Sequence, residues 1–393
     1  DHRDLHSFPT RRSSDLAAGP ERTGGMERET RPAVVVGAGP AGLCAAIELK
    51  RAGAPVLLLD ENAKPGGQLF KQIHKFFGSQ EHRAGVRGIE IGKDLLRESL
   101  DLGIDVRLDT EVVGLDPNLN VWAVEARRRS YTLEASRVIL ATGATENAVP
   151  FPGWTLPGVM TAGCAQTLIN VHRVLPGKRI LMVGSGNVGV IVAYRLIQAG
   201  AEVAAVIEAA PALGGYGVHT AKVRRAGVPM LVRTTIVRAV GSEGVEQAVI
   251  AEVDGKFKPV PGTERTLDVD TICLAVGLTP SIELASLAGC RTFFVPELGG
   301  HMPLHDEFMR SSVPAVYVVG DIAGVEEAST AMEEGRLAGI HAAWSMGYLE
   351  PGEMEKRTAD TRRRLRALRQ GVFGAKRFTA KERVLAEKEK ECL

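Results

Sequence analysis

The most constraining feature of the sequence is a glycine-rich turn that joins an apolar run to an alanine-rich segment. Residues 33–42 read Ala-Val-Val-Val-Gly-Ala-Gly-Pro-Ala-Gly, and residues 43–51 continue as an expected helix. In such a turn Gly37 permits the sharp change of direction, Gly39 lets the backbone approach a pyrophosphate, and Gly42 lets the helix pack on the strand. The start of the helix then offers unpaired N–H groups to a phosphate.

The residues that follow make a dinucleotide the expected ligand of this turn. Residues 55–59 are a second apolar strand that ends in Asp60, where a carboxylate can accept hydrogen bonds from ribose hydroxyls. Glu61, one residue later, is the alternative for this role. The glycine pair ending at Gly67 precedes Gln68, and it lets the backbone pass close to a flat ligand.

The same pattern returns in the middle of the chain. A strand at 178–183 leads into Gly184-Ser185-Gly186-Asn187-Val188-Gly189, followed by an expected helix at 190–199 and a strand that ends in Glu208. An acidic residue there accepts both ribose hydroxyls and repels a 2′-phosphate, so NAD is favoured over NADP. Arg224 and Arg225 are the nearby cations that oppose this preference.

Small-residue turns follow three further apolar strands. The first is Ala141-Thr142-Gly143, the second is a degenerate echo that contains Gly277, and the third is Gly320-Asp321, which precedes an expected helix at 329–341. An aspartate at the end of a strand suits the hydroxyls of a ribityl chain. The order predicts an α/β protein with two Rossmann-like domains, the second inserted in the first.

The expected domain ranges follow from this order. Residues 31–147 and 284–345 form the first domain, 148–283 the second domain with its entry linker, and 346–393 a charged helical tail. We expect the tail to be solvated or to dock a partner, 71–87 to be a long loop, and 147–177 to contain a rigid connection. Residues 1–30 are expected to be a disordered leader. Residues 1–16 match one reading frame of a synthetic sequencing adapter, so we expect this segment to be an artefact. We expect the protein to start at Met26, and its C-terminal end to be open to truncation as well.

Composition excludes several classes of function. The chain of 393 residues is 45% hydrophobic with a net charge of +1, and it has no apolar run of the roughly 18–20 residues that a membrane span requires. This predicts a protein without a membrane span and without a nucleic-acid partner. The five cysteines have no C-x-x-C spacing, so we predict no disulfide framework, no metal site and no redox dithiol, but buried free thiols in a cytoplasmic protein.

The ordered motifs resemble the two-dinucleotide-binding flavoprotein fold that thioredoxin reductase shares with the pyridine nucleotide-disulfide oxidoreductases. The resemblance implies FAD on the first domain and NAD(H) on the second, with the flavin between them. It assigns Asp60 to the adenosine ribose, Val112 to the adenine and Asp321 to the ribityl chain. The other expected cofactor contacts are Gly37, Gly39, Pro40, Ala41, Gly42, Glu61, Gly67, Gln68, Ala141, Thr142, Gly143, Gly320, Gly184, Gly186, Asn187, Val188, Gly189, Glu208 and Gly277.

Finer features narrow the resemblance. Residues 60–68 and 150–163 resemble the A-type chains of opine oxidases, the B-type chain of hydrogen cyanide synthase, and the alpha chains of dye-linked proline dehydrogenase and heterotetrameric sarcosine oxidase. This implies an oligomer with a second flavoprotein subunit that oxidises an amino acid or amine. The redox cysteine pair of the disulfide reductases is missing after Gly67, so we predict an oxidoreductase that is not a disulfide reductase.

The sequence identifies no catalytic residue, because hydride transfer needs distance and orientation more than a proton-transfer group. Candidates near the cofactor are Lys71, His74 and Glu146, and His82 is a further histidine on the same loop as His74. Three hypotheses stay open: an electron-relaying subunit of a heteromeric dehydrogenase, a stand-alone NADH-dependent flavin reductase of a small redox carrier, and a non-catalytic FAD-holding scaffold.

Overall fold

The computed structural model describes residues 27–76 and 79–390. The expectations for the adapter-like segment and for Met26 therefore lie outside the described residues. The first strand, β1 (Glu27–Val36), begins earlier than the expected boundary at residue 31. Glu29 explains part of this extension, because it forms an ion pair with Arg107 at 2.8 Å that holds its pKa at about 2. Polar residues at this end of the strand are thus fixed by charge, which an apolar pattern does not indicate.

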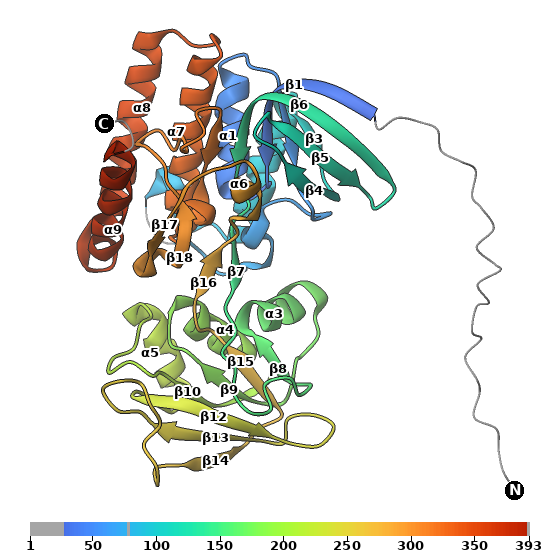
Figure 1. The fold of residues 1–393 in the computed structure, drawn as a ribbon. Helices are drawn as coiled ribbons and strands as arrows, with labels where there is room; N and C mark the ends of the chain where they lie inside the picture. Colours follow the sequence, from blue (N-terminus) through green and yellow to red (C-terminus); the bar gives the residue numbers. More distant parts are fainter. Residues whose placement is uncertain (1–26, 77–78, 391–393) are drawn as a thin grey trace, which may run out of the picture.

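The larger sheet of the described chain contains seven strands in the order β3-β2-β1-β6-β5-β4, with β19 beside β6. β1, β2, β3 and β19 join the sheet in parallel, while β4, β5 and β6 form an antiparallel meander. We call the part built around this sheet the first lobe (Figure 1). The bounds are β2 (Val56–Leu59), β3 (Asp105–Arg107), β4 (Thr110–Leu115), β5 (Asn120–Glu125), β6 (Arg129–Leu140) and β19 (Val316–Val318).

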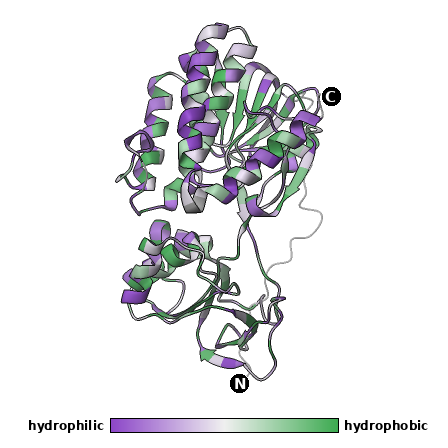
Figure 2. Ribbon diagram, turned by 90° about the vertical axis from the view of Figure 1, so that its left-hand side faces the viewer, coloured by the Kyte–Doolittle hydropathy of each residue, from purple (hydrophilic) through white to green (hydrophobic). Residues whose placement is uncertain are grey.

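Helices cover this sheet. They are α1 (Pro40–Arg51), α2 (Gly88–Asp101), the short α6 (Glu283–Leu287) and α7 (Ala328–Ser345). The backbones of α1 and α7 approach each other closely, since a Cβ atom on Gly335 would overlap the carbonyl oxygen of Ala41. Figure 2 shows hydrophobic residues on the inner strands and many hydrophilic residues on the surrounding helices. The close packing of α1 on α7 brings the turn before α1 near the start of α7.

Two short strands carry the chain between the lobes. β7 (Ala144–Glu146) and β16 (Leu278–Pro280) pair antiparallel, with Glu146 opposite Leu278. Figure 1 shows this pair between the larger upper part and the smaller lower part of the molecule. We call the residues between β7 and β16 the second lobe. The expected domain boundaries at 147/148 and 283/284 fall close to these strands.

The second lobe has a parallel sheet in the order β11-β10-β9-β15-β8 and a three-stranded antiparallel sheet, β12-β13-β14. The strands of the parallel sheet are β8 (Val159–Thr161), β9 (Arg179–Val183), β10 (Glu202–Ile207), β11 (Met230–Leu231) and β15 (Thr271–Leu274). The other strands are β12 (Thr234–Val240), β13 (Gln247–Glu252) and β14 (Arg265–Asp268). The helices of this lobe are α3 (Ala162–Thr167), α4 (Asn187–Gln198) and α5 (Gly217–Arg225). The mixed sheet of the first lobe and the parallel sheet of the second lobe, each with covering helices, confirm the predicted α/β architecture.

The connection expected at 147–177 differs from the prediction. Its proline-rich part is packed, because Phe151 is buried in one core cluster with Ile236 and Ala239. Its second half supplies the edge strand β8 and the helix α3. Proline content hid these contacts, since they are made with β12, a strand distant in sequence. Within the expected loop at 71–87, the described residues 71–76 and 79–87 are irregular apart from the end of a 3-10 helix (Gly67–Lys71) and another at Gln80–His82.

The C-terminal part of the chain forms the hairpin of β17 (Thr292–Val295) and β18 (Gly300–Pro303), and the helices α8 (Pro351–Leu368) and α9 (Gly371–Glu389). The tail is helical as predicted, but it is not simply solvated. Leu365 belongs to the first-lobe core, and the Lys381 side chain is only 3% exposed. Its cations pair with acidic residues of α7, so the tail packs on the first lobe.

None of the helices in residues 27–76 and 79–390 combines the length and apolar character that crossing a membrane requires.

Candidate functional site

The glycines of the first turn have two different physical roles. A Cβ atom on Gly37 would overlap the carbonyl oxygen of Ala141, and one on Gly42 would overlap that of Gly37, so the fold itself requires glycine at both positions. Gly39 is different. Its backbone is extended, with φ −74° and ψ −179°, and the nearest protein atom to an added Cβ is the Gly67 Cα at 3.8 Å. Neither strain nor packing explains this glycine, whereas a ligand at the start of α1 does.

The second turn repeats this division of roles. Cβ atoms on Gly184 and Gly189 would overlap the carbonyl oxygens of Ala275 and Gly184, whereas an added Cβ on Gly186 has no protein atom within 4 Å among the described residues. Gly186 is also extended, with φ −60° and ψ 173°. An added Cβ would thus meet open space at Gly186 and only an ordinary van der Waals contact at Gly39, so a dinucleotide pyrophosphate fits at the N-terminus of both α1 and α4.

Acidic residues at two strand ends support these turns with the same geometry. The Asp60 carboxylate accepts hydrogen bonds from the N–H groups of Ala38 at 2.6 Å and Asn62 at 2.8 Å. The Asn62 side-chain amide donates to the same carboxylate at 3.0 Å, so one of its about four lone-pair positions remains for a ribose hydroxyl. Asp60 is buried directly at the strand end, while its competitor Glu61 is exposed. Partial burial and the neighbouring Asp60 raise the pKa of Glu61.

Glu208 repeats this arrangement in the second lobe. Its carboxylate accepts hydrogen bonds from the N–H groups of Ser185 at 3.0 Å and Ala210 at 2.9 Å. Ser185 and Ala210 stand in the same positions relative to their turn and their acid as Ala38 and Asn62 do in the first lobe.

A second glycine pair backs each turn. Gly66 and Gly67 stand six and seven residues after Asp60, and Gly214 and Gly215 stand six and seven residues after Glu208. The Gly66 N–H donates to the Ala38 carbonyl oxygen at 2.7 Å, and the Gly214 N–H donates to the Ser185 hydroxyl at 3.0 Å. Sequence analysis missed Gly214 and Gly215, although their identical spacing from the acid was the available signal.

The small-residue turns lie where the chain crosses between the lobes. Ala141 donates its N–H to the Val36 carbonyl oxygen at 2.8 Å, and Ala275 donates its N–H to Val183 at 2.7 Å. Gly143 leads directly into β7, and Gly277 leads directly into β16. The two half-sites therefore converge on the crossing strands.

The remaining expected contacts of the first half-site surround the turn. Thr142 donates its hydroxyl to the Ser281 carbonyl oxygen at 2.8 Å, next to the crossing strands. Val112 is half-buried in β4, whose first residue, Thr110, donates its N–H to the Asp60 carbonyl oxygen at 2.8 Å. Pro40 is the first residue of α1, Ala41 is buried, and Gln68 is exposed. In the second lobe, Asn187 is the first residue of α4, and Val188 is exposed.

Asp321 stands at the end of the strand that completes the first lobe, immediately before α7. Its carboxylate accepts a hydrogen bond from the Glu326 N–H at 3.3 Å. Desolvation, together with the nearby carboxylates of Glu334, Glu327 and Glu326, raises its pKa to about 6. An acid held among other acids is unfavourable for folding, so it is a candidate for ligand binding. Gly320 donates its N–H to Glu334 at 3.0 Å.

Lys71 and Glu146 meet at the start of α3. The Lys71 ammonium donates to the Gly163 carbonyl oxygen at 3.4 Å, and burial lowers its pKa. The two Glu146 oxygens accept hydrogen bonds from the Gly163 N–H and the Thr161 hydroxyl, both at 2.7 Å. These contacts join the crossing strand β7 to the second lobe.

The two histidine candidates lie elsewhere. His74 faces α4 and α5, and burial, followed by the charges of Arg195 and His219, lowers its pKa to about 4, so it is neutral at pH 7. His82 is buried, and its ring is within hydrogen-bond distance of Ser79 at 2.8 Å and of Glu333 at 3.1 Å. The structure therefore does not gather Lys71, His74 and Glu146 into one cluster.

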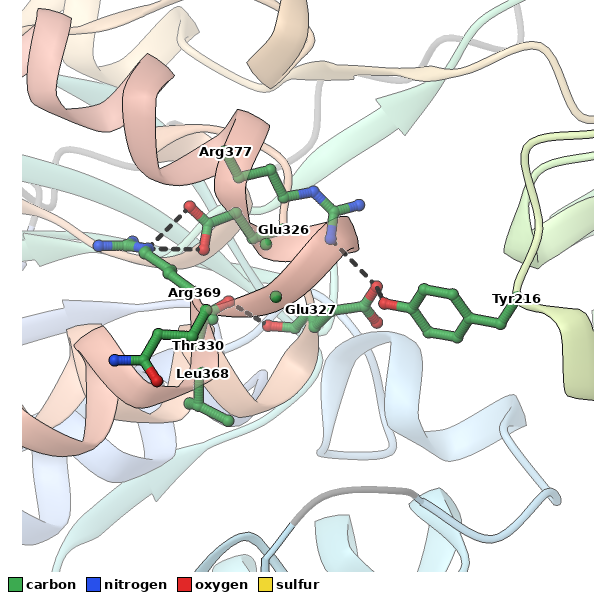
Figure 3. Close-up of a pocket in the computed structure, with 10 residues that line it drawn as sticks. Tyr216, Glu326, Glu327, Thr330, Leu368, Arg369 and Arg377 are labelled. Carbon is green, nitrogen blue, oxygen red and sulfur yellow. Dashed lines mark hydrogen bonds and ion pairs between the residues drawn. The ribbon is translucent and has the colours of Figure 1, made fainter. Parts of the chain in front are cut away.

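Sequence analysis also missed Tyr216, which spans the two lobes. Its hydroxyl donates to Glu327 of the first lobe at 3.0 Å, and Arg377 of α9 donates to the same Glu327 oxygen at 3.2 Å. These groups border a cavity of about 280 Å³ between the second lobe, the start of α7 and the α8–α9 corner (Figure 3). Its position between distant segments left no local signal in the sequence.

Similarity to known proteins identifies the family of this chain. The sequence pattern of the pyridine nucleotide-disulphide oxidoreductase family matches residues 31–335. The chain is 31% identical over 365 residues to the HcnB component of hydrogen cyanide synthase from Pseudomonas aeruginosa, an overlap that covers 88% of this chain and 78% of that protein. It is 30% identical over 354 residues to the A-type chain of opine oxidase from Rhizobium meliloti, an overlap that covers 82% of this chain and 64% of that protein.

A solved structure shows the same fold. L-proline dehydrogenase from P. horikoshii superimposes with a TM-score of 0.64 at 23% sequence identity, over 86% of this chain and 60% of that chain. These relatives are among the groups that the sequence motifs resemble, so the predicted resemblance is confirmed. From the extent of the family match and the identity to these relatives, the chain belongs to the pyridine nucleotide-disulphide oxidoreductase family.

Proposed function

We propose that the first lobe binds FAD, that the second lobe binds NAD(H), and that the chain relays electrons within a multi-subunit enzyme that oxidises an amino acid or amine. The observation that carries the proposal is the duplicated half-site. Each half-site combines an open glycine at a helix N-terminus, Gly39 or Gly186, with a buried or half-buried acid and a backing glycine pair.

The residues of the first half-site fit the parts of FAD. The first N–H groups of α1 face the space for a pyrophosphate, Asp60 presents its carboxylate for ribose hydroxyls, and Asp321 presents its carboxylate for a ribityl chain. The bound flavin would supply the two-electron chemistry. The chain supplies binding, orientation and the position of the lobes relative to each other.

The second half-site favours NAD over NADP because its ribose reader is acidic. Glu208 accepts two backbone hydrogen bonds, so its carboxylate is fixed in position before the nucleotide binds. A 2′-phosphate placed there would meet a negative charge at close range. This is the reason for proposing NAD(H) as the nucleotide of the second lobe.

The relatives support a partner protein. The names of the HcnB component of hydrogen cyanide synthase and of the A-type chain of opine oxidase describe polypeptides that are parts of larger enzymes. We propose that this chain also assembles with a second flavoprotein subunit, which would bind and oxidise the substrate. A stand-alone NADH-dependent flavin reductase is the second candidate, and it is favoured by the presence of both half-sites in one chain.

An anaerobic titration of the FAD-loaded chain tests the proposal. NADH alone bleaching the flavin absorbance at catalytic speed would support the stand-alone reductase. Bleaching that requires an amino acid together with a co-purified amine-oxidising partner would support the relay. A chain that purifies without flavin and takes up none on incubation with FAD would overturn both.

The Glu208→Arg variant tests the nucleotide assignment separately. Loss of the acid and gain of a cation should weaken NAD⁺ binding and strengthen NADP⁺ binding, each by about tenfold or more. Isothermal titration calorimetry with both nucleotides measures the two changes. An unaltered preference would show that Glu208 does not read the ribose.

A further inference from the structure

Tyr216 connects the two half-sites. Its N–H donates to the Asn187 side-chain oxygen at 2.8 Å, and Asn187 is the first residue of α4, where the pyrophosphate would lie. Its hydroxyl donates to Glu327 at 3.0 Å, and Glu327 is the residue immediately before α7. One residue of the second lobe thus reaches from the proposed NAD(H) turn to the first lobe.

The repeated turn does not require this tyrosine. In the first lobe the residue at the same place, eight positions after the acid, is Gln68, and its side chain is exposed. Tyr216 is half-buried instead and points across the gap between the lobes (Figure 3). The two turns therefore differ at this residue, and of the two side chains it is Tyr216 that reaches from its own half-site toward the other lobe.

Arg377 of α9 also contacts Glu327. It donates to the same Glu327 oxygen as Tyr216, at 3.2 Å, so α9 fixes the acceptor that the tyrosine uses. Burial and the charge of Glu327 raise the pKa of Tyr216, which keeps the hydroxyl protonated and able to donate. The adjoining cavity of about 280 Å³ lies just below the usual range for a ligand pocket, so it has room for part of a dinucleotide.

We propose that Tyr216, Glu327 and Arg377 form a latch across the route that the nicotinamide end of a bound dinucleotide takes to the first lobe. This inference rests on the proposed NAD(H) site in the second lobe. With the Tyr216 hydroxyl on Glu327 the lobes are held together and the route is closed. Nucleotide binding then requires the latched state to open, which lowers the apparent affinity by the fraction of molecules that are open.

The Tyr216→Phe variant removes the hydroxyl and keeps the ring. Loss of one hydrogen bond to a carboxylate should raise the open fraction and lower the apparent Kd for NAD⁺ by about three- to tenfold. Arg377→Gln should change the Kd in the same direction, because it removes the second donor to Glu327. Tyr348→Phe, at the opposite end of α7, is the matched control and should leave the Kd unaltered.

The test is calorimetric titration of the FAD-loaded variants with NAD⁺. It is combined with electron–electron distance measurements between spin labels on the two lobes. R128C in the first lobe and F257C in the second lobe, both at exposed positions, supply the label sites in a C164S/C392S background. Tighter NAD⁺ binding by Tyr216→Phe, together with a shift of the label distances to longer values, supports the latch. Weaker or equal binding overturns it, because removing a contact that closes the route must raise the apparent affinity.

Failure of the proposed function is distinguishable from failure of the latch. If neither the wild type nor Tyr216→Phe binds NAD⁺, the assignment of the second lobe is wrong. The label distances then report only whether the Tyr216–Glu327 contact holds the two lobes together, and an unchanged distribution in Tyr216→Phe overturns that role as well. NAD⁺ binding by the wild type with unchanged distances in the variant leaves the proposed function standing and overturns the latch.

Discussion

At the scale of single residues, a glycine in the same motif serves either the fold or a ligand. Gly42 packs so closely that an added Cβ would overlap the Gly37 carbonyl oxygen, whereas an added Cβ on Gly39 lies 3.8 Å from the nearest protein atom. The two glycines are three residues apart and look equivalent in the sequence. Only the atoms around them separate a structural role from a binding role.

Gly39→Val and Gly42→Val should therefore fail in different ways. We expect Gly39→Val to fold and to purify without flavin, because its side chain occupies the space proposed for the pyrophosphate. Gly42→Val should lose several kcal/mol of stability, about 3 or more, because a backbone atom has to move. Flavin absorbance and urea unfolding of the FAD-free proteins measure the two effects. A Gly39→Val protein that still carries flavin, or one that does not fold, would contradict the assignment of a binding role to Gly39 and a structural role to Gly42.

The pKa of Asp321 predicts a second measurable effect. Burial raises this pKa from 3.8 to about 6, so the folded protein holds the proton more tightly than the unfolded chain. The stability of the FAD-free protein should therefore fall as the pH rises from about 4 to about 6, and stay low above that range. Asp321→Asn removes the charge and should be more stable than the wild type at pH 7.5, by about 1–2 kcal/mol.

Urea unfolding of FAD-free Asp321→Asn and wild type between pH 4 and pH 8 tests this effect. The two curves of stability against pH should converge near pH 4, where the wild-type carboxyl is also uncharged. The variant should also bind FAD more weakly. This second result distinguishes an acid that binds the ligand from a buried acid that only destabilises the fold. Equal stability of both proteins at every pH would show that Asp321 carries no such penalty.

Much of the candidate site was predictable from local sequence. Gly39, Asp60, Gly186 and Glu208 each lie in a motif whose spacing indicates the ligand, and each stands at the helix or strand end that the motif implies. Tyr216 was not predictable, because its role depends on a partner 111 residues away. A side chain that acts across a gap between lobes leaves no pattern in its own neighbourhood.

At the scale of elements, the C-terminal helices show that a charged composition alone does not indicate exposure to solvent. The arginines and lysines of α8 and α9 suggest a solvated surface, yet several of them neutralise acids on and beside α7. Arg369 contacts Glu326 at 3.0 Å and Glu334 at 2.6 Å, and the Lys381 ammonium contacts Glu334 at 2.8 Å. Sequence patterns predicted the helices but not their burial, because the matching acids lie in a different segment.

Lys381 makes this packing testable. Its ammonium donates to Glu334 and to the Ala323 carbonyl oxygen, both at 2.8 Å, in a site where it is nearly inaccessible to water. Lys381→Met keeps most of the apolar stem but leaves two buried acceptors without this donor, so we expect a loss of about 3 kcal/mol. Lys390→Met is the control, because the Lys390 side chain is 69% exposed in its pair with Glu387. Exposed pairs contribute about 0–1 kcal/mol.

Urea unfolding of both lysine variants, measured at the same FAD occupancy, gives the comparison. A large loss for Lys381→Met beside a small one for Lys390→Met would establish that α9 is an integral part of the first lobe. Equal small losses would show that the tail is dispensable for its stability. The second result would instead support the solvated or partner-docking role that the composition of the tail indicates.

At the scale of the whole molecule, the architecture is one nucleotide-binding unit interrupted by another. The interruption begins after β7 and ends before β16, and these strands pair with each other. The first-lobe sheet draws all of its strands from outside the interruption, since β19 returns to pair with β6. The core of the first lobe is built from the same outer segments. The second lobe is thus an insertion that the first lobe does not need for its own core.

Excision of the second lobe tests this organisation. Glu146 and Leu278 lie opposite each other on antiparallel strands, so a two-residue Asn-Gly turn can replace residues 147–277 and close β7 and β16 as a hairpin. We expect the shortened protein to fold, to retain FAD and to lose NAD⁺ binding, because only one half-site remains. Flavin absorbance and calorimetric titration with NAD⁺ measure the two properties. A shortened chain that folds but still binds NAD⁺ would move the nicotinamide nucleotide to the first lobe, and one that cannot fold would show that the lobes depend on each other for stability.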